Sequence, residues 1–356
     1  MVGGRGRDVE TAPQCPDLGK TGQQPPGDAR IRSRACGVFP ENRQEDGREC
    51  DILICTMKRI ILLVVTNIAV MLVMMVAFHV VCAFLGVDPV AAFGGTGLDM
   101  TSLAVFSLIF GMGGAVISLL LSKTIAKLSV GARVVDGTEG EAERWLVETV
   151  RSLAERANVQ MPEVAIYEGE ANAFATGAFR NHALVAVSTK IMEQMTREEL
   201  RAVLGHEMSH VANGDMVTTT LVQGVLNAFV IFLSRFVAAV AAGALAKDRN
   251  SRRGASRGIY YLVYYVLQMV LGIAASLVVC WHSRRREYAA DAGSANLLGS
   301  PSSMIAALRR LDNLRPGILP DSLRAMGING RKASLFATHP SIDDRVAALE
   351  RIMRGI

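Results

Sequence analysis

Residues 196–214 read TREELRAVLGHEMSHVANG, and this stretch contains the pattern His-Glu-x-x-His. Thr196 and Glu199 form a capping-box pair, and Asn213-Gly214 supplies a stop, so the stretch predicts a single helix. Apolar residues recur along it at helical spacing: Leu200, Val203, Leu204, Met208 and Val211. The pattern therefore lies on an amphipathic helix with an apolar back.

Two histidines one turn apart point to the same side of such a helix, where they can hold one Zn²⁺. These are His206 and His210, and Glu207 lies beside them as a candidate general base. The alternative explanation is a chance match on a polar helix face. We favour a metal site, because two histidines and a carboxylate on this element need compensation for burial.

Half of the 356 residues are hydrophobic, which is too apolar for an ordinary soluble enzyme. Two apolar runs, 60–85 and 103–121, are each long enough to cross a hydrocarbon core, which takes ~20 helical residues. Basic residues lie at the outer ends of this hairpin: Lys58, Arg59, Lys123, Lys127 and Arg133. The loop between the runs has acids and no Lys or Arg, so the positive-inside rule places both outer ends in the cytoplasm.

Two further apolar runs, 221–245 and 259–281, are also long enough to span a membrane. The loop between them is basic and contains Lys247, Arg249, Arg252, Arg253 and Arg257. A spanning hairpin would export this loop against the positive-inside rule. We leave open whether the hairpin spans or is re-entrant, and we expect Arg235, within the third run, to face protein or a water-filled cavity.

Residues 1–56 are rich in Gly, Pro, Arg and acids, so we expect this extension to be disordered. The run that begins at Met57 resembles a natural N-terminus with a signal anchor, which makes an upstream start-codon choice our interpretation of the extension. The net charge of +5 is spread over membrane-flanking segments. It suits a lipid bilayer with anionic head groups, and no motif indicates a nucleic-acid partner.

A catalytic zinc normally has three protein ligands and one open position, so a third ligand lies outside the helix. Residues 284–293 read RRREYAADAG, which places Glu287 and Asp291 four residues apart on a probable helix. One can bind the metal while the other orients a ligand histidine. Pairing with the preceding arginines on a solvated face is the alternative, and His282 is a competing ligand.

The His-Glu-x-x-His pattern, followed by Asn213-Gly-Asp215 and then by Glu287-Tyr-Ala-Ala-Asp291 after a hydrophobic hairpin, resembles the M48 metallopeptidases. Among these the likeness is to the bacterial HtpX-type membrane proteases, and it runs from about Met57 to the C-terminus. It includes the stretches NAFA and THPS, which are Asn172, Ala173, Phe174, Ala175 and Thr338, His339, Pro340, Ser341.

The resemblance implies that one zinc ion is bound by His206, His210 and Glu287. It further implies that Glu207 is the catalytic base and that Asp291 supports a ligand. Catalysis then follows from proton transfer by Glu207 and polarisation of the scissile carbonyl.

Other residues enter the prediction less directly. The resemblance suggests that His339 and Arg345 approach the substrate oxyanion and that Asp215 has a structural hydrogen-bonding role. Residues 163–167 and 183–188 read as short strands. Between these strands we expect four residues to hold an extended substrate: Asn172, Ala173, Phe174 and Ala175.

We therefore predict a mainly α integral membrane protein, with a zincin-like helical catalytic domain, a small β-sheet and two hydrophobic helical hairpins. Five segments are expected: a disordered extension at 1–56, a transmembrane hairpin at 57–122, the first part of the peptidase domain at 123–218, the second hydrophobic hairpin at 219–282, and the second part of the peptidase domain at 283–356.

The resemblance implies a zinc endopeptidase of the bacterial inner membrane with its catalytic domain facing the cytoplasm. Its expected substrates are misfolded or damaged membrane proteins and unfolded polypeptides, so that the role is quality control under stress. Two alternatives remain: a peptidase of the same family that processes prenylated proteins, and a non-catalytic membrane scaffold or chaperone with a structural zinc. The sequence leaves the oligomeric state open.

Overall fold

The described part of the chain, in a computed structural model, comprises residues 72–73, 75–86, 99–245, 253–314 and 336–355. The chain divides into two units, Met1–Cys55 and Thr56–Ile356, and every described element belongs to the second. The predicted disordered extension and most of the basic loop after residue 245 lie outside the described residues.

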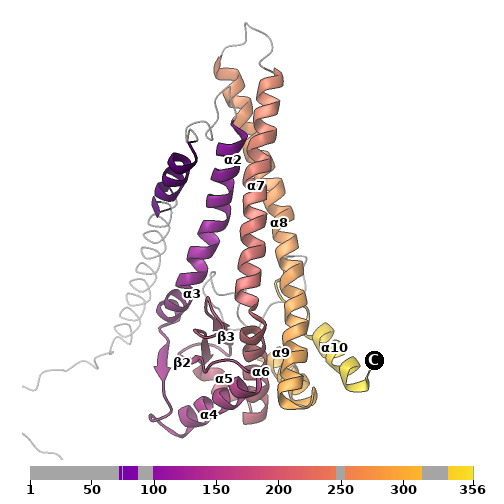
Figure 1. The fold of residues 1–356 in the computed structure, drawn as a ribbon. Helices are drawn as coiled ribbons and strands as arrows, with labels where there is room; N and C mark the ends of the chain where they lie inside the picture. The colour runs from indigo at the N-terminus through magenta and orange to yellow at the C-terminus, as the bar shows by residue number, and fades with distance from the viewer. Residues whose placement is uncertain (1–71, 74, 87–98, 246–252, 315–335, 356) are drawn as a thin grey trace, which may run out of the picture. The chain divides into compact units, whose positions relative to one another are not determined.

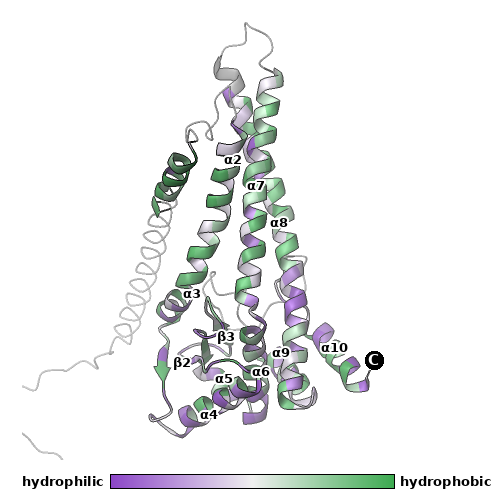
Figure 2. Cartoon of the chain, in the orientation of Figure 1, coloured by the Kyte–Doolittle hydropathy of each residue, from purple (hydrophilic) through white to green (hydrophobic). Residues whose placement is uncertain are grey.

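Long apolar helices form one part of this unit, and Figure 2 shows their hydrophobic residues in green. Among the described residues, three helices are long and apolar enough to cross a membrane: Met100–Val130, Asp215–Ala244 and Arg257–Leu298. A shorter apolar helix, Met75–Leu85, lies within the first predicted run. The protein is therefore a mainly helical membrane protein, as predicted.

Two of these helices, α7 (Asp215–Leu245) and α8 (Arg253–Leu298), pack against each other (Figure 1). The fourth apolar run ends at Trp281, but α8 continues as one helix into the peptidase part of the molecule. No glycine or proline lies between Trp281 and Glu287, so nothing in the sequence ends the helix there. A single element thus carries both an apolar span and a candidate ligand.

The span at Met100–Val130 contains a π-helical turn, η2 (Ile109–Gly113), between α2 (Met100–Leu108) and α3 (Gly114–Val130). Gly111 in this turn packs against α7, and a Cβ built there would lie 2.3 Å from the backbone of Ala228. Only glycine therefore allows this approach of the two helices.

Arg235 on α7 is covered by aromatic rings from both neighbouring helices. Its guanidinium carbon lies 4.3 Å from the ring centroid of Phe106 on α2 and 5.4 Å from that of Tyr264 on α8. Such contacts stabilise a cation away from bulk water. The prediction that Arg235 faces protein is confirmed.

The peptidase part contains a four-stranded sheet in the order β1-β2-β4-β3. The strands are β1 (Arg133–Val135), β2 (Glu163–Tyr167), β3 (Ala173–Thr176) and β4 (Leu184–Ser188). The two predicted strands, β2 and β4, are parallel neighbours, while β1 and β3 pair antiparallel at the two edges. The sequence did not predict β1, because three residues are too short to show a period of two.

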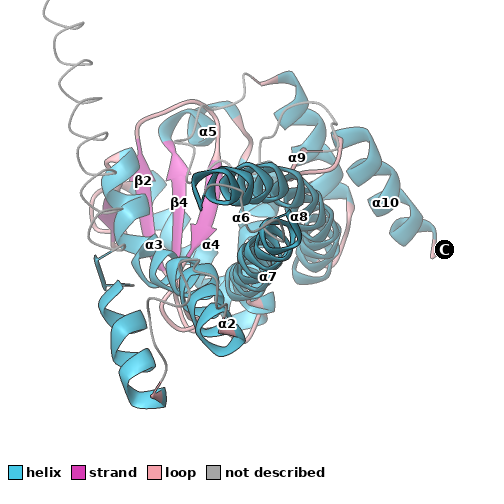
Figure 3. Ribbon diagram, turned by 90° about the horizontal axis from the view of Figure 1, so that it is seen from above, coloured by secondary structure: helices cyan, strands magenta, loops and turns pink. Residues whose placement is uncertain are grey.

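Helices surround this sheet, and Figure 3 shows the strands beside the long helices. They are α4 (Glu141–Arg156), α5 (Thr189–Gln194), α6 (Arg197–Asn213), α9 (Ser302–Asn313) and α10 (Ile342–Arg354). α6 packs against β3, α4, α8 and α9, so it lies at the centre of this part.

The predicted bounds of α6 are confirmed. The capping box is formed in full: the Thr196 side chain accepts from the backbone of Glu199, and the Glu199 carboxylate accepts from the backbone N–H of Thr196. The helix ends at Asn213, and Gly214 adopts the left-handed conformation with φ 68°. The predicted apolar back is buried in the core: Leu200, Val203, Leu204, Met208 and Val211.

Candidate metal centre

The site forms where α6 crosses α8, and small residues allow the two helices to come close. A Cβ at Gly205 would lie 2.8 Å from the Ser294 hydroxyl, and one at Gly293 would lie 2.5 Å from the Ser209 hydroxyl. Ser294 Oγ also donates to the carbonyl of Ala202 at 2.8 Å. This crossing brings residues about 80 positions apart in the sequence into contact.

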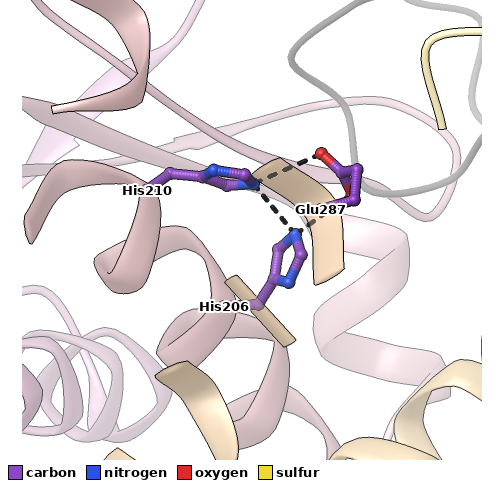
Figure 4. A group of neighbouring side chains, drawn as sticks. All are labelled: His206, His210 and Glu287. Atoms are coloured by element: carbon purple, nitrogen blue, oxygen red, sulfur yellow. Dashed lines mark hydrogen bonds and ion pairs between the residues drawn. The ribbon is translucent and has the colours of Figure 1, made fainter. Parts of the chain in front are cut away.

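Three candidate ligands meet at the crossing, and Figure 4 shows them turned toward one another. They are His206, His210 and Glu287, whose nearest donor atoms all lie within 4.8 Å of one another. His206 Nε2 lies 3.1 Å from His210 Nε2. The Glu287 carboxylate oxygens lie 3.5 Å from His206 Nε2 and 3.4 Å from His210 Nε2.

These separations fit a tetrahedral zinc ion. Zinc-to-ligand bonds of about 2.0–2.1 Å at tetrahedral angles place neighbouring ligand atoms ~3.3 Å apart. In addition, Glu287 Oε2 is buried and makes no hydrogen bond with any residue that the structure describes. A buried, unsatisfied carboxylate oxygen beside two imidazole nitrogens is a donor set that suits zinc.

An aspartate holds the outer nitrogen of each histidine. His206 Nδ1 lies 2.9 Å from Asp291 Oδ1, and His210 Nδ1 lies 2.6 Å from Asp215 Oδ2. Because an ionised carboxylate only accepts hydrogen bonds, each Nδ1 carries the donated proton, and Nε2 of each ring is the nitrogen that faces Glu287. Such carboxylate–histidine pairs fix the tautomer that binds a metal.

Two arginines in turn hold the two aspartates. Arg345 Nε and Nη2 donate to the two oxygens of Asp291 at 2.8 and 2.7 Å, and Arg286 pairs with Asp215. The sequence suggested that Arg345 approaches the substrate oxyanion; its buried guanidinium pairs with Asp291, and Nη1 lies 3.5 Å from Glu287. This bidentate pairing fixes the position of the Asp291 carboxylate.

The electrostatics of the cluster favour positive charge where the three donors meet. Burial lowers the pKa of His206 and of His210, but hydrogen bonds to neighbouring carboxylates outweigh burial, so that both pKa values lie above the usual histidine range. The carboxylates on His206 are Asp291 and Glu287, and those on His210 are Asp215 and Glu287. The site is therefore built to hold a cation.

Glu207 is buried next to the candidate ligands and touches the edge strand. Burial raises the pKa of Glu207, whereas the nearby histidines and a hydrogen bond from the backbone N–H of Ala175 oppose the rise. A carboxylate with a raised pKa is a better proton acceptor than an exposed one. Glu207 thus lies between the ligands and β3.

The segment 172–175 consists of Asn172 and the first three residues of β3, and its position is fixed by local hydrogen bonds. The Asn172 backbone N–H donates to Ser188 Oγ at 3.0 Å, and Asn172 Oδ1 accepts from the backbone of Ala173 at 2.9 Å. The Tyr167 hydroxyl donates to the Asn172 carbonyl at 3.3 Å. These hydrogen bonds fix the start of the edge strand within the sheet, and the strand packs against α6, the helix that carries the histidines.

His339 is also brought to the site, whereas His282 is not. His339 Nδ1 lies 3.0 Å from Glu287 Oε2 without hydrogen-bond geometry, and neither ring nitrogen has a hydrogen-bond partner among the described residues. The His206, His210 and Glu287 cluster does not include His282.

Asp215 was expected in a structural hydrogen-bonding role, and its carboxylate accepts from His210 Nδ1 at 2.6 Å. The sequence did not indicate which residue Asp215 contacts, nor that Arg286 pairs with it. Gly214, with φ 68°, turns the chain at the end of α6, which returns Asp215 to the preceding turn. An aspartate directly after such a glycine is the local signal that identifies this contact.

Comparison with known proteins agrees with this architecture. A model of Peptidase family M48 matches residues 141–353. A protease HtpX homolog from Janthinobacterium sp. (strain Marseille) is 53% identical over 298 residues, which is 83% of this chain and 100% of that protein. One from Bordetella pertussis (strain Tohama I) is 52% identical over 303 residues, which is 84% of this chain and 100% of that protein.

The fold is also similar to that of a solved structure, Ste24p of S. mikatae. The TM-score is 0.56 at 17% sequence identity, over 85% of this chain and 67% of that one. The fold and the site define a membrane-embedded metallopeptidase. The chain belongs to peptidase family M48, within its HtpX-type membrane proteases.

Proposed function

We propose that His206, His210 and Glu287 hold one zinc ion and that the protein is a zinc endopeptidase. The observation that carries this proposal is that the two Nε2 atoms lie 3.1 Å apart and that each lies 3.4 to 3.5 Å from an oxygen of the Glu287 carboxylate, close to the edge length of a zinc tetrahedron. When bound, zinc supplies a Lewis acid that polarises the scissile carbonyl.

Glu207 is the proposed general base. Its carboxylate accepts a proton from the attacking water and then delivers that proton to the leaving amine. His339 is the proposed donor to the developing oxyanion, supported by the position of its ring beside Glu287 and by ring nitrogens that make no hydrogen bond to any described residue. Arg345 and Asp291 keep His206 in the orientation that this chemistry needs.

The substrate lies along β3 in this proposal. β3 is an edge strand, so an extended peptide can add to the sheet through backbone hydrogen bonds, which accommodate varied sequences. The Ala175 N–H that donates to Glu207 lies on this strand, so a peptide paired there passes next to the base. The strand residues concerned are Asn172, Ala173, Phe174 and Ala175.

The proposed substrates are misfolded or damaged membrane proteins, cleaved at the cytoplasmic side of the bacterial inner membrane. Two features support this choice: the candidate spans that lead directly into the metal centre, and the similarity to protease HtpX homologs over most of the chain. The basic residues at the outer ends of the first hairpin support the orientation.

A cleavage assay on detergent-purified protein tests the proposal. We expect the wild-type protein with added Zn²⁺ to cleave an unfolded membrane protein, and Glu207→Ala to lose roughly 10²–10⁴-fold in rate because proton transfer is removed. Metal content, measured on the same samples, is expected to stay at one zinc per chain in both. Equal cleavage by the two proteins would contradict the assignment of Glu207. Bound zinc without any cleavage by wild type would favour the scaffold alternative.

A further inference from the structure

A cavity of about 510 Å³ lies between α7 and α8, away from the metal centre. Its polar lining consists of Gln223 and Asn227 on α7 and Gln268 and Ser276 on α8, and we call it the amide cavity. All four residues lie within candidate membrane spans. Polar side chains at this depth are costly and usually mark a functional path or site.

The cavity offers both hydrogen-bond donors and acceptors. Gln223 Nε2 donates to Asn227 Oδ1 at 3.0 Å, which leaves the Gln223 oxygen and the Asn227 nitrogen for a ligand. Gln268 Oε1 is buried and has no hydrogen-bond partner among the described residues. A buried amide oxygen without a partner is unfavourable, so a ligand that donates to it gains free energy.

No charged side chain of the described residues lines the cavity, and this restricts the ligand. Phosphate head groups and carboxylates require Arg or Lys for tight binding in such a place, so a neutral ligand fits better. A peptide group is neutral and supplies one donor and one acceptor. The amide side chains therefore complement a polypeptide backbone.

A membrane-spanning substrate needs such a partner for its backbone. Its helix must unwind before an active site can take it in extended form, and non-helical backbone at membrane depth is tolerated only inside protein or a polar cavity. We propose that the amide cavity binds the partly unwound transmembrane segment of a substrate protein through hydrogen bonds to its backbone. This inference rests on the proposed function and names the part of the substrate that is recognised.

The cavity is accessible from the direction of the lipid. Met269 and Ile273 on α8 belong to its lining and are 61% and 49% exposed. Both side chains are apolar, and exposed apolar residues on a candidate span face hydrocarbon. A transmembrane segment can thus enter sideways between α7 and α8 without passing through water.

The other end of the cavity leads toward the metal centre. Phe336 lines the cavity, and its carbonyl accepts from Cys280 Sγ at 3.4 Å. The next carbonyl, of Ala337, accepts from Arg284 at 2.9 Å, and His339 two residues later lies beside Glu287. The chain from 336 to 339 therefore follows α8 from the cavity to the candidate ligands.

The distance between the two sites suits an extended peptide. About three turns of α8, or ~16 Å, separate Ser276 from Glu287. An extended chain covers ~3.3 Å per residue, so about five residues bridge this distance. The proposal thus predicts that membrane substrates are cut about five residues from the segment bound in the cavity.

Filling the cavity tests the proposal. A Cβ at Gly272, in the lining, meets no atom within 4 Å, so Gly272→Leu projects into the cavity without displacing backbone. Gly258→Leu is the matched control, since Gly258 lies on the same helix, also has open space and is not part of the lining. The full-length proteins are compared on a single-span membrane reporter and on a soluble unfolded polypeptide.

We expect Gly272→Leu to raise KM for the membrane reporter at least ~10-fold more than KM for the soluble polypeptide, because ground-state binding of the span is lost. Gly258→Leu is expected to keep the wild-type ratio. An unchanged ratio in Gly272→Leu, or an equal loss on both substrates, would overturn the proposal.

Binding is also measured without turnover. A photo-crosslinking residue in place of Gly272, in the Glu207→Ala protein, is expected to capture the transmembrane segment of the reporter. Capture supports the cavity as a binding site even if the wild-type protein cleaves neither substrate, which would refute only the proposed function. Absence of capture, with the same residue in place of Gly258 as background, overturns the inference.

Discussion

Each candidate ligand histidine is held by an aspartate, and each aspartate is held by an arginine. In the first set, Arg345 holds Asp291, which holds His206. In the second set, Arg286 holds Asp215, which holds His210. The arginines pair with the buried aspartates, and the aspartates keep Nε2 of each imidazole on the metal side. Two matched supports of this kind restrict both rings before any ion binds.

The first prediction separates ligands from the base. Replacing His206, His210 or Glu287 by Ala should remove most bound zinc, because a catalytic site has only three protein ligands. Glu207→Ala should keep the metal and lose turnover, since it removes proton transfer and not coordination. Metal analysis of the purified variants measures this, with His282→Ala as the control that retains zinc. Full zinc in Glu287→Ala together with loss in His282→Ala would refute the ligand set.

The second prediction concerns the supports of the histidines. Asp215→Ala and Asp291→Ala should each weaken zinc affinity roughly 10–100-fold, as loss of the partner of a ligand histidine does. Arg286→Gln should weaken it as well, through Asp215, whereas the neighbouring Arg285→Gln should not, because Arg285 lies 4.7 Å over the Trp281 ring instead. Competition with a chelator measures the affinities, and equal affinity in the two arginine variants would contradict the role of Arg286.

At the scale of elements, α8 joins the membrane part to the peptidase part. Its apolar half packs on α7, and its polar half supplies Glu287 and Asp291 to the crossing with α6. The crossing is close because Gly205 and Gly293 have no side chains there. Movement of α8 along its axis would therefore move a candidate ligand, which couples the span to the site.

The third prediction tests the contact of η2 with α7. Gly111→Ala would place a Cβ 2.3 Å from the backbone of Ala228, so we expect a loss of roughly 1–3 kcal/mol of stability, as overpacking typically costs. Gly114→Ala is the matched control one turn on, because a Cβ there meets nothing within 4 Å. Thermal unfolding in detergent compares the two. Equal melting temperatures would show that the helices separate easily at this point.

At the scale of the whole molecule, the path of the second hairpin through the membrane decides how substrates reach the site. α7 is 31 residues long, or ~46 Å, which exceeds a hydrocarbon core of ~30 Å. Both α7 and α8 join the peptidase part at one end, and their length leads us to expect a spanning path. The basic loop would then lie on the opposite side, against the positive-inside rule.

The fourth prediction tests this topology in intact cells. A cysteine at Gly140→Cys should be shielded from a membrane-impermeant label, since the peptidase part is expected in the cytoplasm. At Asn250→Cys, in the loop outside the described residues, we expect labelling, because a spanning hairpin exports it. The native cysteines are replaced first, so that only the introduced thiol reacts. Protection at both positions would support a re-entrant hairpin instead.

The sequence by itself determined the local features of the chain. The capping box at Thr196 and the stop at Gly214 set both ends of α6, and short runs rich in Val, Ile and Ala located β2 and β4. The apolar runs likewise identified the candidate spans. These features follow from adjacent residues, because caps, periodicity and hydrophobic length act over one element at a time.

Only the tertiary structure decided which distant groups meet. Arg345 reaches Asp291 across 54 positions and holds that carboxylate. The edge position of β3 beside Glu207 depends on the order of four strands, and the amide cavity depends on how α7 lies on α8. No local pattern encodes these contacts, because they arise from the packing of whole elements against one another.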